Sequence, residues 1–162
     1  MVSQRWLINI VEHLRRLFGG NPPRVQAAAL PWRREPGRIE VLLITSRGTG
    51  RWVLPKGWPE GNETLAETAA REAWEEAGVK GTVARTELGR YFYEKQTGTG
   101  LRWRCEVAVF PLEVKREAKR WPEMKQRTHR WVSLKEAGLM VDEPDLKELL
   151  ATFESNSRKI AA

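Results

Sequence analysis

Three glutamates with the potential for metal chemistry lie close together in one segment. Glu72, Glu75 and Glu76 are spaced i, i+3 and i+4, so a helix would place their carboxylates on one face. Like charges at this spacing repel by roughly a few tenths of a kcal/mol per pair, and by more where a neighbouring sheet removes water. Mg²⁺ or Mn²⁺ would offset this repulsion, because such hard ions take oxygen ligands and are shared with substrate phosphates. A solvated surface helix rich in glutamate is the alternative.

The charge of the chain is unevenly distributed around these glutamates. The sequence has 28 Lys and Arg against 21 Asp and Glu, a formal net charge of +7. Residues 57–79 contain six glutamates and one basic residue, Arg71, so this segment carries −5 and the rest of the chain +12. An acidic cluster inside a basic protein suits a metal site that attracts polyanions. A solvated helix face explains the charge equally well.

The glutamates belong to a longer pattern of fixed spacing. The segment GWPEGNETLAETAAREAWEEAGV matches G-x5-E-x7-R-E-U-x-E-E-x-G-U, where U is a bulky aliphatic residue. Eight positions fall on the pattern, with Ala73 as a small substitute at the first U: Gly57, Glu63, Arg71, Glu72, Glu75, Glu76, Gly78 and Val79. This pattern is the Nudix box, and the chain therefore resembles the Nudix hydrolases. The resemblance implies an α+β fold of the α/β/α sandwich type with a mixed sheet, and hydrolysis of a phosphoanhydride joined to an organic moiety.

The resemblance also implies which residues are catalytic. Glu72, Glu75 and Glu76 would bind Mg²⁺ or Mn²⁺, helped by the backbone carbonyl of Gly57. A water between metal and carboxylate loses a proton easily and attacks phosphorus. Either Glu76 or Glu72 would act as the base, and Glu123 in the downstream loop is a third candidate for a base or an extra ligand.

The remaining residues of the box are structural in this resemblance. Arg71 and Glu63 would form an ion pair that holds the loop against the helix. Thr64 and Glu67 have the spacing of a capping box, and Gly78 suits the left-handed position after the helix end.

The sequence outside the box bears on the substrate. The runs RWVLPKGWPEGNET and QRTHRWVSLKEA resemble the branch that includes diphosphoinositol polyphosphate phosphohydrolases and diadenosine polyphosphate hydrolases. Several cations around one metal site suit a polyphosphorylated small molecule. We predict that substrate is bound by Arg47, Arg51, Lys56, Arg102, Arg104, Arg127 and Arg130. The alternatives are an RNA 5′-pyrophosphohydrolase, with nucleic acid the less favoured partner, and a non-catalytic nucleotide-binding module.

The box needs a sheet and further helices to position it. Apolar content or alternation predicts strands over residues 25–30, 38–45, 51–54, 83–93, 101–114 and 127–132. Helices are predicted over residues 63–77 and 142–153, which completes a Nudix domain over residues 21–162. Residues 1–20 form a separate region with an amphipathic helix over residues 5–18. This helix would pack on its own domain or join two copies in a homodimer, and the alternatives are membrane-surface association and a cleavable transit peptide.

Length and composition limit the class of protein. A chain of 162 residues corresponds to one globular domain. No apolar run reaches the roughly 18–20 residues of a membrane span, so we predict no transmembrane segment. The single cysteine, Cys105, cannot form an internal disulfide, and two histidines argue against a Cys/His zinc site. A reducing compartment fits these features, and we predict a cytoplasmic protein.

Overall fold

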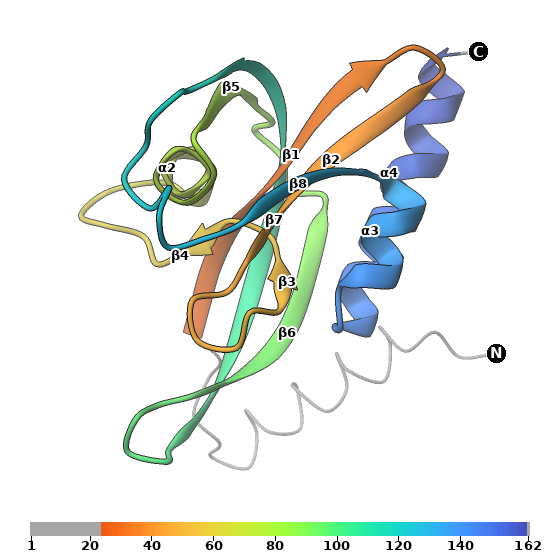
Figure 1. The fold of residues 1–162 in the computed structure, drawn as a ribbon. Coiled ribbons are helices and arrows are strands. Elements are labelled where there is room, and N and C mark those ends of the chain that lie inside the picture. Colours follow the sequence, from red (N-terminus) through yellow and green to blue (C-terminus); the bar gives the residue numbers. More distant parts are fainter. Residues whose placement is uncertain (1–23, 162) are drawn as a thin grey trace, which may run out of the picture.

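The computed structural model describes residues 24–161, which form a β-sheet with helices on both faces (Figure 1). The strands are β1 (Arg24–Glu35), β2 (Arg38–Thr45), β3 (Trp52–Val53), β4 (Lys56–Gly57), β5 (Val79–Val83), β6 (Gly89–Gln96), β7 (Arg102–Glu117) and β8 (His129–Ser133). The helices are α2 (Leu65–Ala77), α3 (Leu134–Met140) and α4 (Pro144–Ala161). The predicted helix over residues 5–18 and the homodimer formed through it lie outside the described residues.

The sheet is mixed, because β1 and β7 are parallel while the other pairs are antiparallel. Its central order is β3-β2-β1-β7-β5, with β4 paired to β1, β6 to β7 and β8 to β2. Strand β1 pairs with β4 at Ala27 and Ala28 and with β2 from Trp32 onward. Strand β4 thus places the start of the Nudix box beside the middle of the sheet.

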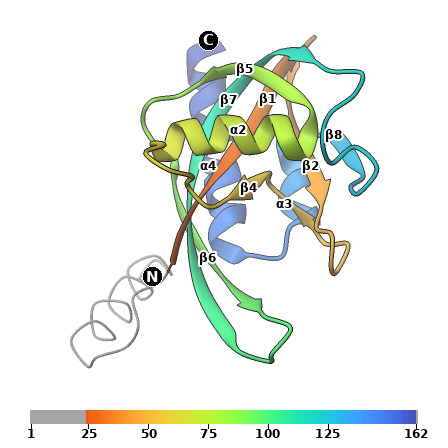
Figure 2. The ribbon, with the colours of Figure 1, turned by 90° about the vertical axis from the view of Figure 1, so that its left-hand side faces the viewer.

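Both faces of the sheet are buried. Along β1, Ala28 and Leu30 pack in the core that includes α3 and α4, whereas Ala27 and Ala29 pack in the core that includes α2. All four side chains are fully buried. Figure 2 shows α2 crossing one face of the sheet with α4 behind the other. The architecture is therefore the α/β/α sandwich predicted from the sequence.

Helix α2 forms where capping and packing agree. The Thr64 side chain accepts from the backbone N–H of Glu67, and the Glu67 side chain accepts from the backbone N–H of Thr64, which completes the predicted capping box. The helix ends at Gly78, whose φ of +69° is the left-handed conformation that favours glycine. Ala73 and Ala77 belong to a buried stripe of small side chains, so the helix axis can lie close to the sheet.

The prediction of one strand over residues 83–93 is wrong, because residues 84–88 are a connection that separates the end of β5 from the start of β6. Strands β5 and β6 lie end to end along one edge of β7 and pair with its C-terminal and N-terminal parts. The connection stays close to β7, since Ala84 N–H donates to Pro111 O at 2.8 Å and Leu88 N–H donates to Val109 O at 2.7 Å. Pro111 has no N–H to donate, which interrupts the pairing at this point. The apolar alternation continues across this interruption and conceals it.

Other boundaries differ from the prediction by a few residues, and two elements were not predicted. Helix α3 follows β8 directly through a capping box between Ser133 and Glu136, but its seven residues are too short to show a clear helical period. Strand β4 has only two residues and forms because β1 lies beside it. The predicted C-terminal helix begins at Pro144 rather than at residue 142, because proline is favoured in a first helical turn. Among residues 24–161, no helix is long and apolar enough to cross a membrane.

Candidate active site

The Nudix box begins where β4 leads toward α2. Gly57 ends β4 and lies so close to the Glu72 carboxylate that a Cβ at position 57 would overlap it. Only glycine allows the backbone to approach a side chain this closely. Glu72 is buried, and this burial raises the pKa of its carboxyl group. The Gly57 backbone and the Glu72 oxygens therefore share one buried corner of the site.

Arg71 ties the loop to two glutamates of the helix. Its Nε and Nη2 donate to the two oxygens of Glu63 at 2.9 and 3.2 Å, and Nη2 also donates to the Trp58 carbonyl at 2.9 Å. Its Nη1 donates to Glu72 at 2.8 Å and to Glu75 at 3.2 Å. The hydrogen bonds from Arg71 are the main reason that the pKa of Glu63 falls to about 2. One guanidinium thus fixes the loop and also partly neutralises the acidic face.

Glu76 lies at the other end of the acidic face, between two cations. One of its oxygens accepts from the backbone N–H of Lys56 at 3.1 Å, and the other accepts from Nη2 of Arg127. Burial raises the pKa of Glu76 to about 7, although the charges of Arg127 and Lys56 act in the opposite direction. Burial therefore outweighs the nearby cations.

Arg127 comes from the loop before β8 and is buried inside the site. Besides its contact with Glu76, it donates to Glu123 at 2.5 Å and to the Thr45 carbonyl at 3.0 Å. The backbone N–H of Glu123 donates to the Glu75 carbonyl at 3.0 Å, so the loop carries a fourth carboxylate to the end of α2. Arg127, which we predicted to bind substrate, neutralises two carboxylates of the site.

The donor set of the acidic face fits a hard divalent cation. Glu72, Glu75 and Glu76 supply carboxylate oxygens from one face of the helix. The Glu75 side chain is 39% exposed, which leaves the face open to solvent. Across residues 24–161, no three acidic, histidine or cysteine side chains are gathered at the spacing of metal ligands. Guanidinium groups lie against these carboxylates instead, and Arg71 contacts two of them.

Two of the other predicted substrate-binding arginines lie in different places. Arg47 is near the acidic face, with its Nη1 3.7 Å from the Glu123 carboxylate and 3.1 Å from Oε1 of Gln126. Arg130 pairs with Leu43 between β8 and β2, and Leu43 packs in the core beneath α3 and α4. Arg130 is therefore on the sheet face opposite α2.

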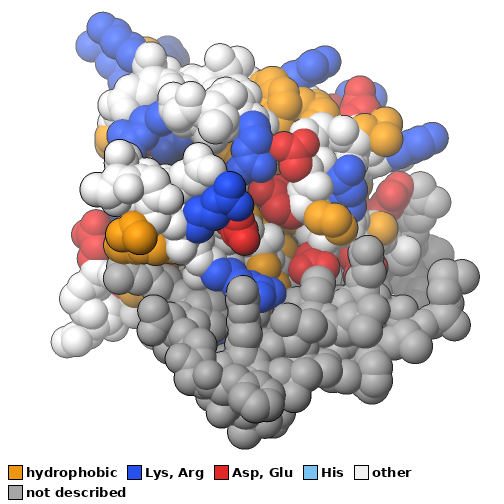
Figure 3. All heavy atoms as spheres, turned by 90° about the horizontal axis from the view of Figure 1, so that it is seen from below, with side chains coloured by type: hydrophobic (Ala, Val, Ile, Leu, Met, Phe, Trp, Pro, Cys, Tyr) orange, Lys and Arg blue, Asp and Glu red, His pale blue; other side chains and the backbone are white. Residues whose placement is uncertain are grey.

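Two further predicted arginines, Arg102 and Arg104, lie in the N-terminal part of β7, where it pairs with β6. Arg102 is 67% exposed and pairs with Glu94 at 3.4 Å, and the Arg104 guanidinium lies 4.8 Å from the centroid of the Phe92 ring. Figure 3 shows Lys and Arg side chains beside Asp and Glu side chains near the centre of the face seen from below. The basic side chains on this face are thus interspersed with acidic ones.

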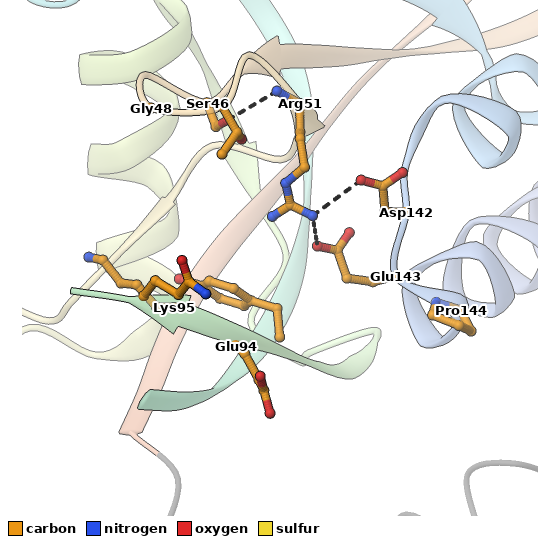
Figure 4. A pocket seen from close by; sticks show the side chains of 11 residues that line it. Ser46, Gly48, Arg51, Glu94, Lys95, Asp142, Glu143 and Pro144 are labelled. Carbon is orange, nitrogen blue, oxygen red and sulfur yellow. Dashed lines mark hydrogen bonds and ion pairs between the residues drawn. The ribbon is translucent and has the colours of Figure 1, made fainter. Parts of the chain in front are cut away.

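A pocket of about 560 Å³ opens between the β2–β3 loop, the end of β6 and the connection from α3 to α4. In its wall, Nη1 of Arg51 donates to Asp142 and to Glu143, each at 3.2 Å (Figure 4). Arg51 was predicted to bind substrate, whereas the pocket acids Asp142 and Glu143 were not predicted. They immediately precede Pro144, and their place in the sequence has no fixed spacing to the Nudix box.

Lys56 connects this pocket with the acidic face of α2. It pairs with Ala28 between β4 and β1, and Ala28 faces the core beneath α3 and α4, so the Lys56 side chain points to the face opposite α2. There its Nζ lies 5.5 Å from the centroid of the Tyr93 ring, which lines the pocket. Burial lowers the pKa of Lys56, while the charges of Glu76 and Glu143 act to raise it. The Lys56 backbone therefore contacts the acidic face, while its side chain lies beside Tyr93 of the pocket wall.

The NUDIX domain family matches residues 22–153. The chain belongs to the Nudix family. Nudix hydrolase 16, mitochondrial, of Arabidopsis thaliana is 36% identical over 143 residues, which cover 78% of this chain and 77% of the relative. Nudix hydrolase 13, mitochondrial, of the same plant is 40% identical over 105 residues, which cover 62% of this chain and 52% of the relative. The chain spans about half the length of some relatives, such as Nudix hydrolase 13. These relatives are named as mitochondrial, so the cytoplasmic location of this chain stays a prediction.

Solved structures support the same fold. A Caenorhabditis elegans Ap4A hydrolase in a binary complex superimposes with a TM-score of 0.63 at 22% identity, covering 84% of this chain and 98% of that one. The NUDIX domain of Shewanella oneidensis NrtR, complexed with ADP ribose, gives a TM-score of 0.60 at 16% identity, covering 87% and 97%. Similarity at this level of sequence identity establishes the Nudix fold of the chain but does not identify its substrate, which has to be inferred from the chemistry of the site.

Proposed function

We propose that this Nudix protein is a divalent-metal-dependent hydrolase of phosphoanhydride bonds in polyphosphorylated small molecules, either diadenosine polyphosphates or diphosphoinositol polyphosphates. The main support is the acidic face of α2, where Glu72 lies against the Gly57 backbone. Mg²⁺ or Mn²⁺ would be held by Glu72, Glu75, Glu76 and the Gly57 carbonyl. A metal bound there supplies positive charge to the phosphate oxygens and acidity to a water.

The chain's own carboxylates would receive the proton of the attacking water. Glu76 suits this role because burial raises its pKa to about 7, close to the pH at which a general base is most effective. Glu72 is a second candidate, since burial also raises its pKa. Glu123 is a third, because its loop reaches the end of α2 and its side chain contacts Arg127.

Cations around the acidic face would hold and orient the phosphates. Arg47 is the exposed member of this group, and its side chain is 60% accessible beside Glu123. Lys56 lies between the acidic face and the pocket, so it is placed to contact a phosphate chain that joins the two. These positions favour a substrate whose organic part lies in the pocket and whose reacting phosphates lie at α2.

A hydrolysis panel tests the proposal. The purified protein is incubated with Mg²⁺ or Mn²⁺ and diadenosine polyphosphates, diphosphoinositol phosphates, nucleoside triphosphates, ADP-ribose or RNA with a 5′-triphosphate, and the products are resolved by ion-exchange chromatography. We expect kcat/KM to be highest for one of the first two classes. A best rate on RNA would support the RNA 5′-pyrophosphohydrolase, and binding without hydrolysis of any compound would identify a non-catalytic module.

A further inference from the structure

The pocket opposite α2 has a buried acceptor in its wall. The Glu143 side chain is 9% exposed, and its Oε1 accepts from Arg51 at 3.2 Å. Its Oε2 has no hydrogen-bond partner among the residues that the structure describes. An unpaired carboxylate oxygen in a buried position is unfavourable, and a ligand with an N–H donor would relieve this. Glu143 therefore gives the pocket wall an unused acceptor.

The charge of the pocket does not suit a cluster of phosphates. Its charged lining consists of three carboxylates, from Glu94, Asp142 and Glu143, and two cations, from Arg51 and Lys95. Arg51 is already paired with two of the acids. A phosphate-rich group would meet two carboxylates, Asp142 and Glu143, that share the single guanidinium of Arg51, whereas a neutral group with N–H donors would meet acceptors.

The size and the aromatic wall of the pocket suit a flat ring. Its volume of about 560 Å³ is typical of a small-molecule site. The Tyr93 hydroxyl donates to Oε1 of Gln26 at 2.5 Å, which fixes the orientation of the ring. An aromatic side chain held in this way offers an apolar surface to a heterocycle. On the same side of the sheet, Nζ of Lys56 lies 5.5 Å from the centroid of the Tyr93 ring, and the Lys56 backbone N–H donates to Glu76 of the acidic face.

We propose that this pocket binds an adenine base of the substrate and that Oε2 of Glu143 accepts a hydrogen bond from its exocyclic amino group. The inference rests on the proposed function and narrows it, because it selects diadenosine polyphosphates over diphosphoinositol polyphosphates. Oε2 is buried as the structure has it, so the proposed hydrogen bond requires a rotation of the carboxylate, and the broad terminal torsion of a glutamate allows one. Glu143 is thus a specificity-determining residue.

The first test compares two ligands that differ only at the amino group. AMP and purine riboside 5′-monophosphate, which lacks that group, are titrated by calorimetry into the full chain in excess chelator. A hydrogen bond to a charged acceptor predicts that AMP binds about tenfold or more tightly than its analogue. Equal affinities, or no AMP binding at millimolar concentration, would overturn the inference.

The second test changes the acceptor. In Glu143→Gln the amide oxygen must take the place that accepts from Arg51, so the NH₂ group occupies the position of Oε2 and opposes the amino group of adenine. The preference for AMP should then disappear. Glu87→Gln is the matched control, because it removes a carboxylate from another arginine pair, with Arg90 at 2.9 Å, and should retain the preference. Retention of the preference in Glu143→Gln would refute the role of Oε2.

These titrations are independent of catalysis, so the two proposals can fail separately. Hydrolysis of polyphosphates by a protein that binds AMP and its analogue equally would retain the proposed function and refute the adenine pocket. Tighter binding of AMP than of its analogue, without hydrolysis of any substrate, would retain the adenine pocket and refute the proposed function. Diphosphoinositol phosphate as the best substrate would also count against the adenine pocket.

Discussion

Replacing Glu76 by glutamine tests how the acidic face behaves without metal. In the folded protein, burial raises the pKa of Glu76 from an ordinary value of 4.5 to about 7. A raised folded-state pKa contributes stability that is fully present below pH 4.5 and is lost as the pH rises through 7. Above this range the carboxylate is both ionised and buried. Glutamine retains the shape of the side chain without the charge, so Glu76→Gln should be the more stable protein in chelator at pH 8.

The size of this effect follows from the same pKa values. A difference between 4.5 and about 7 corresponds to about 3 kcal/mol of unfolding free energy, at 1.36 kcal/mol for each pKa unit. The Glu76 side chain is only 8% exposed, so solvent screens little of it. For a domain of this length, about 3 kcal/mol corresponds to a rise in Tm of about 6–12 °C. Glu63 has a lowered pKa of about 2, so its contribution to stability is lost only as the pH falls below 4.5. It therefore does not affect the change in stability between pH 5 and pH 8.

Urea denaturation in excess chelator at pH 5 and pH 8 measures the effect. The parent should lose stability between these two pH values, and Glu76→Gln should lose less. Glu75→Gln is the matched control, because it carries the same change on the same helix face at a side chain that is 39% exposed. A Glu76→Gln protein less stable than the parent at pH 8 would show that the contact with Arg127 outweighs the cost of burial, and the reasoning would fail.

Three further predictions concern activity and metal binding. Glu75→Gln and Glu76→Gln should each lower kcat about a hundredfold or more in steady-state assays with excess Mg²⁺, because metal charge stabilisation supplies several kcal/mol, and full activity in both would refute their role. Gly57→Ala should lower kcat/KM about a hundredfold, because the added Cβ displaces the Glu72 carboxylate. Gly98→Ala is the control and should match the parent, since position 98 has open space around it. Equal kcat/KM values for the parent, Gly57→Ala and Gly98→Ala would contradict this prediction. Millimolar Mg²⁺ or Mn²⁺ should raise the Tm of the parent more than that of Glu76→Gln, and equal rises in thermal denaturation would show that Glu76 is not a ligand.

The sequence predicts the acidic face well because its geometry is local. Residues 63–78 contain the capping box, the three glutamates and the glycine that ends the helix, and helical spacing alone relates them. The contact between Arg71 and Glu63 is also short in sequence, at eight residues. The relative positions of these residues can therefore be predicted from their spacing on one helix, without knowledge of the sheet.

The pocket could not be predicted because it depends on strand pairing. Arg51 and Glu143 are 92 residues apart, and they meet only because the β2–β3 loop and the connection before α4 lie at the same end of the sheet. The direction of Lys56 depends on its pairing with Ala28 in β1, which two residues of β4 do not reveal. Arg127 likewise appears as one more surface cation in the sequence, whereas the fold buries it between Glu76 and Glu123.

One short strand, β4, places its two residues on opposite faces of the sheet. In β4, Gly57 faces α2 and allows the Glu72 carboxylate to approach the backbone. Its neighbour Lys56 faces the opposite side because successive side chains of a strand alternate, and it reaches the Tyr93 ring in the pocket wall. In the proposed complex, a substrate whose organic group lies against Tyr93 would direct its phosphates past Lys56 toward α2. Since a shift of register by one residue would exchange the two faces, the pairing of β4 with β1 determines both the approach of Glu72 and the direction of Lys56.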